Sequence, residues 1–315
     1  MLIGPSIRIA SARGGESRLS IFLFHRVLPA PDPLFPGEVD VAAFDRMVGW
    51  ISRWFQVLPL PDALRRLREG RLSAGSAAIT FDDGYADNLT HALPILLRHQ
   101  ASATLFVATG FLDGGRMWND TLIESVRRTP LAQIDLSAIG MAAVPTGGDA
   151  DKRQAIEALI PRLKHLPPEQ RQAQVAAVAR ASQAVLPDDL MLRSAQLKAW
   201  RRAGMDVGAH TVNHPILSKT APAAARQEMA DSKAVLESLL GERIGLFAYP
   251  NGKPGQDYQP EHARMAAELG FDAALSTAWG AARRDSDPFE LPRFTPWDRT
   301  RLRFGLRLVQ NLLSS

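Results

Sequence analysis

Two adjacent carboxylates, Asp82 and Asp83, follow directly after the apolar segment Ser76–Phe81. In α/β proteins the carboxyl ends of the strands are the places where ligands bind. Adjacent residues on an extended chain point in different directions, so one carboxylate can bind a metal while the other acts as a base. The competing interpretation is a surface turn, because the Asp-Asp-Gly sequence is common in loops.

A second polar group follows another apolar segment, since His210 and His214 come soon after Val207. Two histidines four residues apart lie on one face of a helical turn and form a familiar metal-binding pair. Neutral imidazole is the commonest nitrogen ligand for zinc. The alternative is one buried, hydrogen-bonded histidine and one surface histidine. Two histidines and one aspartate together make a ligand set that leaves positions open for water and substrate.

The composition limits which chemistry is available to the chain. It has 315 residues and no cysteine, which excludes a cysteine nucleophile, thiolate metal sites and iron–sulfur clusters. Apolar residues make up 46% and charged residues 22%, which excludes a disordered, collagen-like or disulfide-rich protein. The net charge is +4, and the only short basic cluster lies at the C-terminus, so we expect no nucleic-acid binding.

Short apolar segments that alternate with helical patterns indicate a parallel sheet with crossover helices. The expected strands are Leu19–His25, Ser76–Phe81, Ala103–Ala108, Met205–Ala209, Ile244–Tyr249 and Ala273–Ser276. The expected helices include Val41–Arg53, Asp87–His99, Pro222–Leu240 and Pro260–Leu269, with Asp87 and Thr220 as cap residues. This order predicts an α/β fold, either an open sheet or a barrel.

Three regions are expected along the chain: an N-terminal extension over residues 1–18, an α/β domain over 19–298 and a C-terminal helix over 299–315. The stretch from about 112 to 193 lacks an expected strand and is helical in pattern, which indicates an insertion the size of a small subdomain. No apolar run is long enough to span a membrane. The first residues also lack an apolar signal core, so we expect a cytoplasmic protein, with contact to a membrane at most peripheral.

The C-terminal helix has an apolar face with interspersed arginines. The residues that share this face are Leu302, Leu306, Val309 and Leu313. Such a helix can dock on an anionic membrane surface or a partner, or it can simply pack on the α/β domain.

The two polar motifs together resemble a known family. Thr-Phe-Asp-Asp-Gly-Tyr over residues 80–85, followed by His-Thr-x-x-His over 210–214, is similar to the polysaccharide deacetylases of the NodB-homology group, carbohydrate esterase family 4. The resemblance extends from about Leu19 to Phe294, apart from the insertion, and implies a distorted (β/α)7-type barrel. It also implies hydrolysis of N-acetyl groups on a sugar or polysaccharide, with release of acetate and a free amine.

The resemblance assigns roles at matching positions. Asp83, His210 and His214 would bind a divalent metal, often zinc, and Asp82 would be the general base. The metal would polarise the acetamide carbonyl and lower the pKa of its bound water.

A third motif departs from the family, which commonly has Arg-x-Pro-Tyr where this chain has Ala248 and Asn251. The backbone N–H of Asn251 can still supply an oxyanion donor, because a side-chain change leaves it in place. The missing arginine needs a substitute, and we expect Arg293 to hold Asp82 after barrel closure; the alternative is a surface arginine. A branch of the family found with exopolysaccharide genes has similar sequences in both regions.

Many members of the family take their general acid from a histidine late in the chain, but here no histidine follows His262. Some branches instead have a Tyr-His pair at the first strand, and Phe24-His25 resembles that pair, so the resemblance implies His25 as the general acid. The alternative is a histidine that only caps the strand. The expected substrate-binding residues are Tyr85, Trp118, Tyr249 and Pro250, although Trp118 can equally anchor the insertion.

The expected substrate is an N-acetylated glycan or a lipid-linked sugar, either an exopolysaccharide or a precursor of a cell-surface glycan. Two alternatives stay open. One keeps the site for hydrolysis of a non-sugar C–N bond, and the other is a catalytically decayed binding protein, supported only by the altered third motif.

Overall fold

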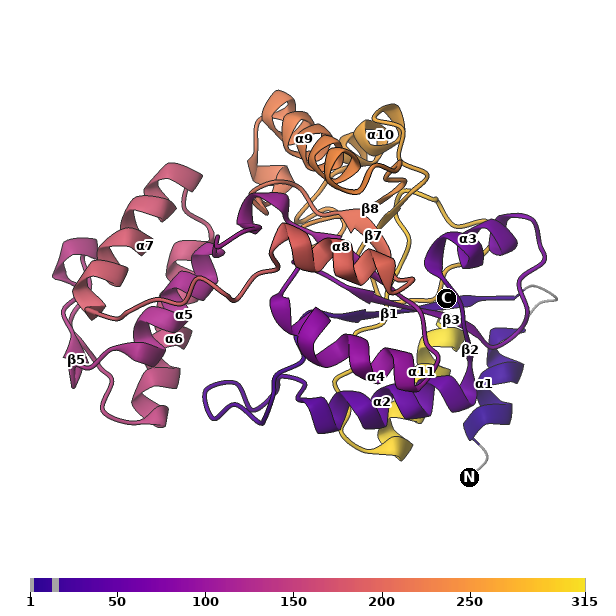
Figure 1. Ribbon diagram of the computed structural model, residues 1–315, viewed down its shortest axis with the longest axis horizontal. Coiled ribbons are helices and arrows are strands. Elements are labelled where there is room, and N and C mark those ends of the chain that lie inside the picture. Colours follow the sequence, from indigo (N-terminus) through magenta and orange to yellow (C-terminus); the bar gives the residue numbers. More distant parts are fainter. Residues whose placement is uncertain (1–2, 13–16, 315) are drawn as a thin grey trace. The chain divides into compact units, whose positions relative to one another are not determined.

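The computed structural model describes residues 3–12 and 17–314 of the chain, which form two compact units (Figure 1). The first unit takes the described residues of Met1–Ala30, Val39–Leu112 and Leu192–Ser315. The second takes Pro31–Glu38 and Asp113–Met191.

The first unit is built on a sheet whose main path runs β1-β3-β4-β7-β8-β9, with every neighbouring pair parallel and β2 paired to β3. The strands are β1 Leu19–Phe24, β2 Gln56–Val57, β3 Ser76–Phe81, β4 Ala103–Val107, β7 Asp206–Ala209, β8 Leu246–Ala248 and β9 Ala273–Leu275. Residues of β1, β3 and β4 are buried on both faces, which explains their unbroken apolar sequences. The expected strands and the α/β barrel class are confirmed.

One late segment of the chain links the two ends of this sheet. Leu291 pairs with Leu275 of β9, and Phe294 pairs with Phe22 of β1, both in parallel orientation. The backbone N–H of Phe294 donates to the carbonyl of Ile21 at 2.7 Å. The segment therefore closes the curled sheet between its first and last strands, and it carries Arg293 into the closed region.

Helices connect and cover the strands (Figure 1). In the first unit they are α2 Val41–Trp54, α3 Leu60–Arg68, α4 Leu93–Arg98, α8 Ser194–Arg202, α9 Pro222–Leu240 and α10 Pro260–Glu268, with short turns at Asn88–Ala92, Thr109–Phe111 and Leu217–Lys219. The side chain of Asp40 caps α2 by accepting from the N–H of Ala43 at 2.7 Å.

The expected helix Asp87–His99 begins as a π-helical turn over Asn88–Ala92 before it continues as α4. The expectation that Asp87 caps it is wrong. Its carboxylate instead accepts from the N–H of Val27 at 3.1 Å and from the Nε of Arg26 at 2.8 Å. The Thr220 cap is also wrong, since α9 starts after Ala221 and has no side-chain cap.

The two ends of the chain form a helix pair in the first unit. Helix α1, Ile3–Ser11, packs against α11, Arg301–Leu313. Residues 1–2 and 13–16 of the expected N-terminal extension, and residue 315 of the expected C-terminal segment, lie outside the described residues. Among residues 3–12 and 17–314, no helix is both long enough and apolar enough to cross a membrane.

The second unit has its own apolar core, with Leu122, Leu159, Leu163 and Val178 fully buried. It contains α5 Trp118–Arg128, α6 Asp149–Lys164 and α7 Pro168–Ser182, a short turn at Ser137–Ile139 and a small antiparallel pair, β5 Gln133–Ile134 with β6 Val144–Pro145.

The segment Pro31–Glu38 joins the second unit, although it precedes the insertion by more than seventy residues. Its Asp32 carboxylate accepts two hydrogen bonds from the Arg127 guanidinium of α5, at 3.0 and 2.6 Å. Burial opposes ionisation of Asp32, but Arg127 and backbone N–H groups hold its pKa below the usual value. Neither this segment nor the β5–β6 pair was expected from the sequence.

Candidate active site

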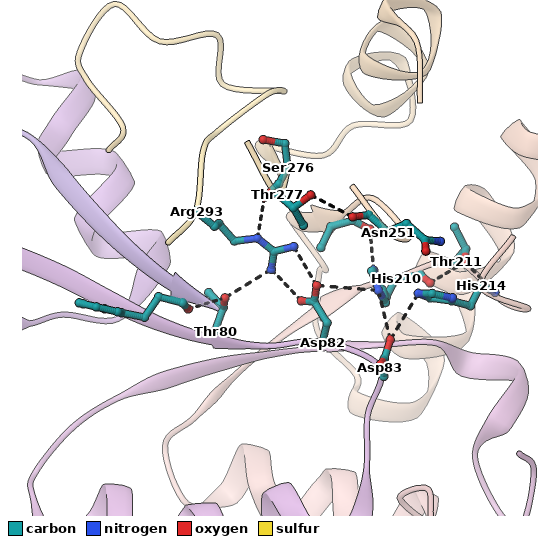
Figure 2. A network of polar contacts seen from close by, with 12 residues as sticks. Thr80, Asp82, Asp83, His210, Thr211, His214, Asn251, Ser276, Thr277 and Arg293 are labelled. Carbon is teal, nitrogen blue, oxygen red and sulfur yellow. Dashed lines mark hydrogen bonds and ion pairs between the residues drawn. The ribbon is translucent and has the colours of Figure 1, made fainter. Parts of the chain in front are cut away.

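Asp82 directly follows β3, and Arg293 binds both oxygens of its buried carboxylate. The Arg293 guanidinium donates to both carboxylate oxygens, at 2.7 and 2.8 Å, and to the carbonyl of Ser276 at 2.8 Å (Figure 2). Both side chains are almost fully buried. The expected contact between Arg293 and Asp82 is therefore confirmed, and the surface alternative for Arg293 is excluded.

The Asp82 carboxyl group is held in its ionised form although it is buried. Burial favours the protonated form, but the charge and the hydrogen bonds of the Arg293 guanidinium outweigh it and hold the pKa of Asp82 below its usual value. A carboxylate kept ionised at neutral pH can accept a proton.

The Asp83 side chain points away from Arg293 and toward two histidines, because adjacent residues at a strand end point in different directions. Its Oδ1 lies 3.5 Å from the Nε2 of His210 and 3.4 Å from the Nε2 of His214 (Figure 2). The expected ligand atoms of all three residues lie within 4.8 Å of one another. The two histidines reach the site from the end of β7 and the loop after it.

These three residues fit a divalent metal. The Oδ1 of Asp83 is buried and accepts no hydrogen bond, although it faces two imidazole nitrogens. The Nδ1 of His210 lies 2.7 Å from the carbonyl of Ala248; a proton on Nδ1 donates to this oxygen and leaves Nε2 as an electron-pair donor toward Asp83. Burial lowers the pKa of His214 to about 4, so its ring is neutral near pH 7.

Several residues of the site have a strained, left-handed backbone conformation. Among the described residues, seven non-glycine residues have positive φ, and four of them are Asp83, Thr211, His214 and Asn251. Such conformations cost energy and persist only where surrounding contacts enforce them. One such contact is the 3.1 Å hydrogen bond from the N–H of His214 to the Oγ1 of Thr211.

Asn251 presents a backbone donor beside these groups. Its φ is +60°, a conformation that asparagine tolerates better than most residues. Its carbonyl accepts from the Oγ1 of Thr277 at 2.9 Å, which fixes the peptide. Its own N–H has no acceptor among the described residues, and its role as an oxyanion donor stays a prediction.

His25 follows β1 and is exposed, unlike the strand before it. Its charge contributes to the pKa values of Asp82, Asp83 and His214, so its imidazole lies in the electrostatic neighbourhood of all three. Its carbonyl accepts from the Nδ2 of Asn88 at 2.8 Å, which ties this loop to the turn after β3. Its role as general acid stays a prediction.

A comparison with protein families decides what kind of chain carries this site. The family model "Polysaccharide deacetylase" matches residues 69–135 and 152–274, more than half of the chain, and includes Asp82, Asp83, His210 and His214. The chain belongs to the polysaccharide deacetylase family.

Relatives and solved structures agree with this assignment. The chain is 22% identical over 279 residues to the Bacillus subtilis (strain 168) protein named "Putative polysaccharide deacetylase YxkH", covering 88% of this chain and 71% of that protein. The fold is similar to Streptococcus pyogenes deacetylase PplD in complex with acetate, with TM-score 0.63, 21% identity, and coverage of 94% of this chain and 99% of that one. IcaB from Ammonifex degensii is similar at TM-score 0.58 and 17% identity, with 94% of this chain and 97% of that chain covered.

Two of the residues that we expected to bind substrate in this family member are tyrosines that lie largely buried. Tyr249 is fully buried, stacks on Tyr258 at 3.8 Å and donates its hydroxyl to the carbonyl of Phe289, so the prediction that it contacts substrate is wrong. Tyr85 is only 4% exposed and lies under the Arg26 guanidinium, and its contact with substrate stays a prediction. Tyrosine rings are apolar enough to be buried in a protein interior.

Pro250 is also buried, and its carbonyl accepts from the N–H of Gly252 at 2.7 Å; its contact with substrate stays a prediction. It shapes the turn that presents Asn251. Trp118 starts α5 in the second unit, where it packs at the edge of that core with the Arg171 guanidinium over its ring. This is the anchoring role; contact of Trp118 with a sugar stays a prediction.

Glu228, which was not expected from the sequence, holds the loop between the two histidines. From the middle of α9, its carboxylate accepts from the N–H groups of Val212 and Asn213 at 2.9 and 2.8 Å, and from the Nδ2 of Asn213 at 2.7 Å. A glutamate on an ordinary helix carries no local motif, so only the tertiary contact reveals it.

If Asp83, His210 and His214 hold a divalent metal, we expect Glu228→Gln to weaken its binding roughly 10–100-fold, with zinc as the probe, because partners that orient metal ligands typically contribute that much. A glutamine has a single acceptor oxygen and cannot serve all three donors. Competition with a chromophoric chelator measures the affinity. Asp231→Asn, on the exposed side of the same helix, is the matched control and should bind zinc like the wild type. Equal affinity in both variants would contradict the role of Glu228.

Proposed function

We propose that this member of the polysaccharide deacetylase family is a metal-dependent hydrolase that removes N-acetyl groups from a sugar unit. The substrate would be a polysaccharide, such as an exopolysaccharide, or a lipid-linked precursor. The observation that carries the proposal is the pairing of buried Asp82 with Arg293 beside the ligand set Asp83, His210 and His214. A decayed site would have no need to keep both.

Asp83, His210 and His214 would hold a divalent metal, with zinc suited to two imidazoles and a carboxylate. When bound, such an ion supplies Lewis acidity and lowers the pKa of water toward 7. The remaining groups belong to the chain. Asp82 takes a proton from the attacking water, and Arg293 keeps this carboxylate ionised and oriented.

The residues of the site account for the bonds that form and break and for the protons that move. The water oxygen forms a bond to the acetyl carbon, and the N–H of Asn251 donates to the oxygen that becomes negative. His25 gives a proton to the nitrogen as the C–N bond breaks, so that acetate and a free amine leave.

We expect His25→Ala to retain bound zinc but lose turnover by roughly 10²–10⁴-fold, the usual contribution of a general acid. His25 is exposed, so the substitution should leave the fold and the melting temperature unchanged. Steady-state acetate release and zinc content measure the two effects. Wild-type turnover in His25→Ala would remove this residue from the mechanism and leave the rest of the proposal in place.

The experiment that tests the proposed function is acetate release from a panel of N-acetylated oligosaccharides and lipid-linked sugars. The zinc-supplied protein is compared with the same protein after chelation and after zinc is returned. Release that follows the metal supports the proposal and begins to identify the sugar. No release with zinc bound would favour a non-sugar amide, and no release with no bound zinc would favour a binding protein.

A further inference from the structure

Helix α11 has two apolar faces, and only one of them packs on the protein. Phe304, Leu308 and Leu312 are fully buried in the main core. On the other side, Leu302, Leu306 and Leu313 are 51%, 46% and 45% exposed. These three lie at helical spacing of four and seven residues, so they form one stripe on the surface. About half of the surface of each of these three side chains is therefore open to solvent.

The charge on this part of the chain is predominantly positive. All charged residues of α11 are arginines, at 301, 303 and 307, and the first two are exposed. Asp298 is the sole acidic residue from position 291 to the end of the sequence, and its carboxylate pairs with Arg307 at 3.0 Å. The leucine stripe is therefore flanked by positive charge.

Further apolar side chains lie exposed at the elements that adjoin α11. Trp297, three residues before Thr300 at the start of the helix, is 66% exposed. Trp279 is 45% exposed, and its indole N–H donates to the Oγ of Ser314 at the end of the helix. Ile9 on α1, which packs against α11, is 76% exposed. Tryptophan with arginine and leucine is the composition of helices that lie in a membrane interface.

From this combination we infer that the outer stripe of α11, with Trp297 and Arg303, docks on a membrane surface that contains anionic lipid. The leucines and tryptophan enter the boundary between headgroups and acyl chains, while the arginines meet the lipid phosphates. A second copy of the chain would cover the stripe without a lipid, and the test separates this case from docking on a membrane. Docking on a membrane does not depend on the proposed function. The benefit of docking, which would place the enzyme beside a lipid-linked substrate, rests on the proposed function.

The test is co-sedimentation of the full chain with vesicles of phosphatidylcholine alone and with vesicles that also contain phosphatidylglycerol. We expect binding to the anionic vesicles that weakens as salt is raised. The variants Leu302→Ser/Leu306→Ser and Arg301→Gln/Arg303→Gln should each reduce the partition coefficient about tenfold. Because all four side chains are exposed, their melting curves should match the wild type.

Leu97→Ser and Val235→Ser are matched controls, because they remove similarly exposed apolar side chains, 52% and 44% exposed, on α4 and α9. They should bind vesicles like the wild type. Absence of binding to anionic vesicles would overturn the inference, as would equal loss in the control variants. Light scattering that shows a dimer, dissociated by Leu302→Ser/Leu306→Ser, would assign the stripe to a second copy instead. Neither failure would bear on acetate release from soluble substrates.

Discussion

Replacing Asp82 by asparagine is expected to reduce acetate release by roughly 10²–10⁴-fold, because a general base typically contributes that much. Asparagine keeps the size of the side chain and one acceptor oxygen for Arg293, but it cannot take a proton from water. The ligand set Asp83, His210 and His214 is unchanged, so zinc content should equal that of the wild type. Turnover and zinc content, measured on the same preparation, check both expectations.

The comparison variant is Asp83→Asn, which is expected to lose both turnover and zinc. Asp82 and Asp83 are adjacent in sequence yet face different partners, Arg293 in one case and the two histidines in the other. If Asp82→Asn also loses its zinc, the two carboxylates share the metal and the division of roles between them is wrong.

The second large effect concerns stability as well as catalysis. We expect Arg293→Met to destabilise the fold by about 3–5 kcal/mol, because it leaves the buried Asp82 carboxylate without its charge partner. It also frees the carboxylate to turn, so turnover should fall while the metal stays bound. Chemical denaturation and acetate release are the measurements.

Two further variants separate charge from geometry. Arg293→Lys keeps a positive charge but loses the two-pronged contact, so it should retain more stability than activity. Adding Asp82→Asn to Arg293→Met removes the unpaired charge and should restore part of the stability, with no gain in turnover. If Arg293→Met unfolds at the same denaturant concentration as the wild type, the pair does not have this structural role.

The pH dependence of this pair has a defined sign. The folded protein holds the pKa of Asp82 below its usual value, so the pair stabilises the fold above the usual carboxylate pKa. That contribution disappears as the pH falls through the lowered pKa. The stability gap between wild type and Arg293→Met should therefore be large at neutral pH and narrow in acid.

The groups that could be predicted from the sequence share one property: they stand in short motifs at strand ends. Asp82 and Asp83 adjoin β3, His210 adjoins β7, and Asn251 follows β8, so the order of the elements already brings them to one edge. The contact from Arg293 to Asp82 spans 211 residues and was reached only through the missing arginine of the third motif and the expected barrel closure.

The features that could not be predicted depend on tertiary contacts with no local signal. Glu228 is one polar residue among several on α9, and nothing in the sequence says which one meets the histidine loop. Tyr249 ends the expected strand and directly follows β8 in the observed structure, but only packing against Tyr258 shows that its ring faces inward. In α11 the stripe of Leu302 and Leu306 was visible in the sequence, whereas the buried face around Phe304 was not.

The segment that closes the sheet is also among the last parts of the chain to be synthesised, so the proposed centre can be completed only late in translation. Asp82 leaves the ribosome 211 residues before Arg293, a delay of roughly 10–40 s at ordinary elongation rates. Until then the nascent chain has neither the bridge from β9 to β1 nor a partner for the buried carboxylate. A chain terminated before Leu291 would contain every expected metal ligand and still lack an assembled centre, so incomplete products of translation should not deacetylate.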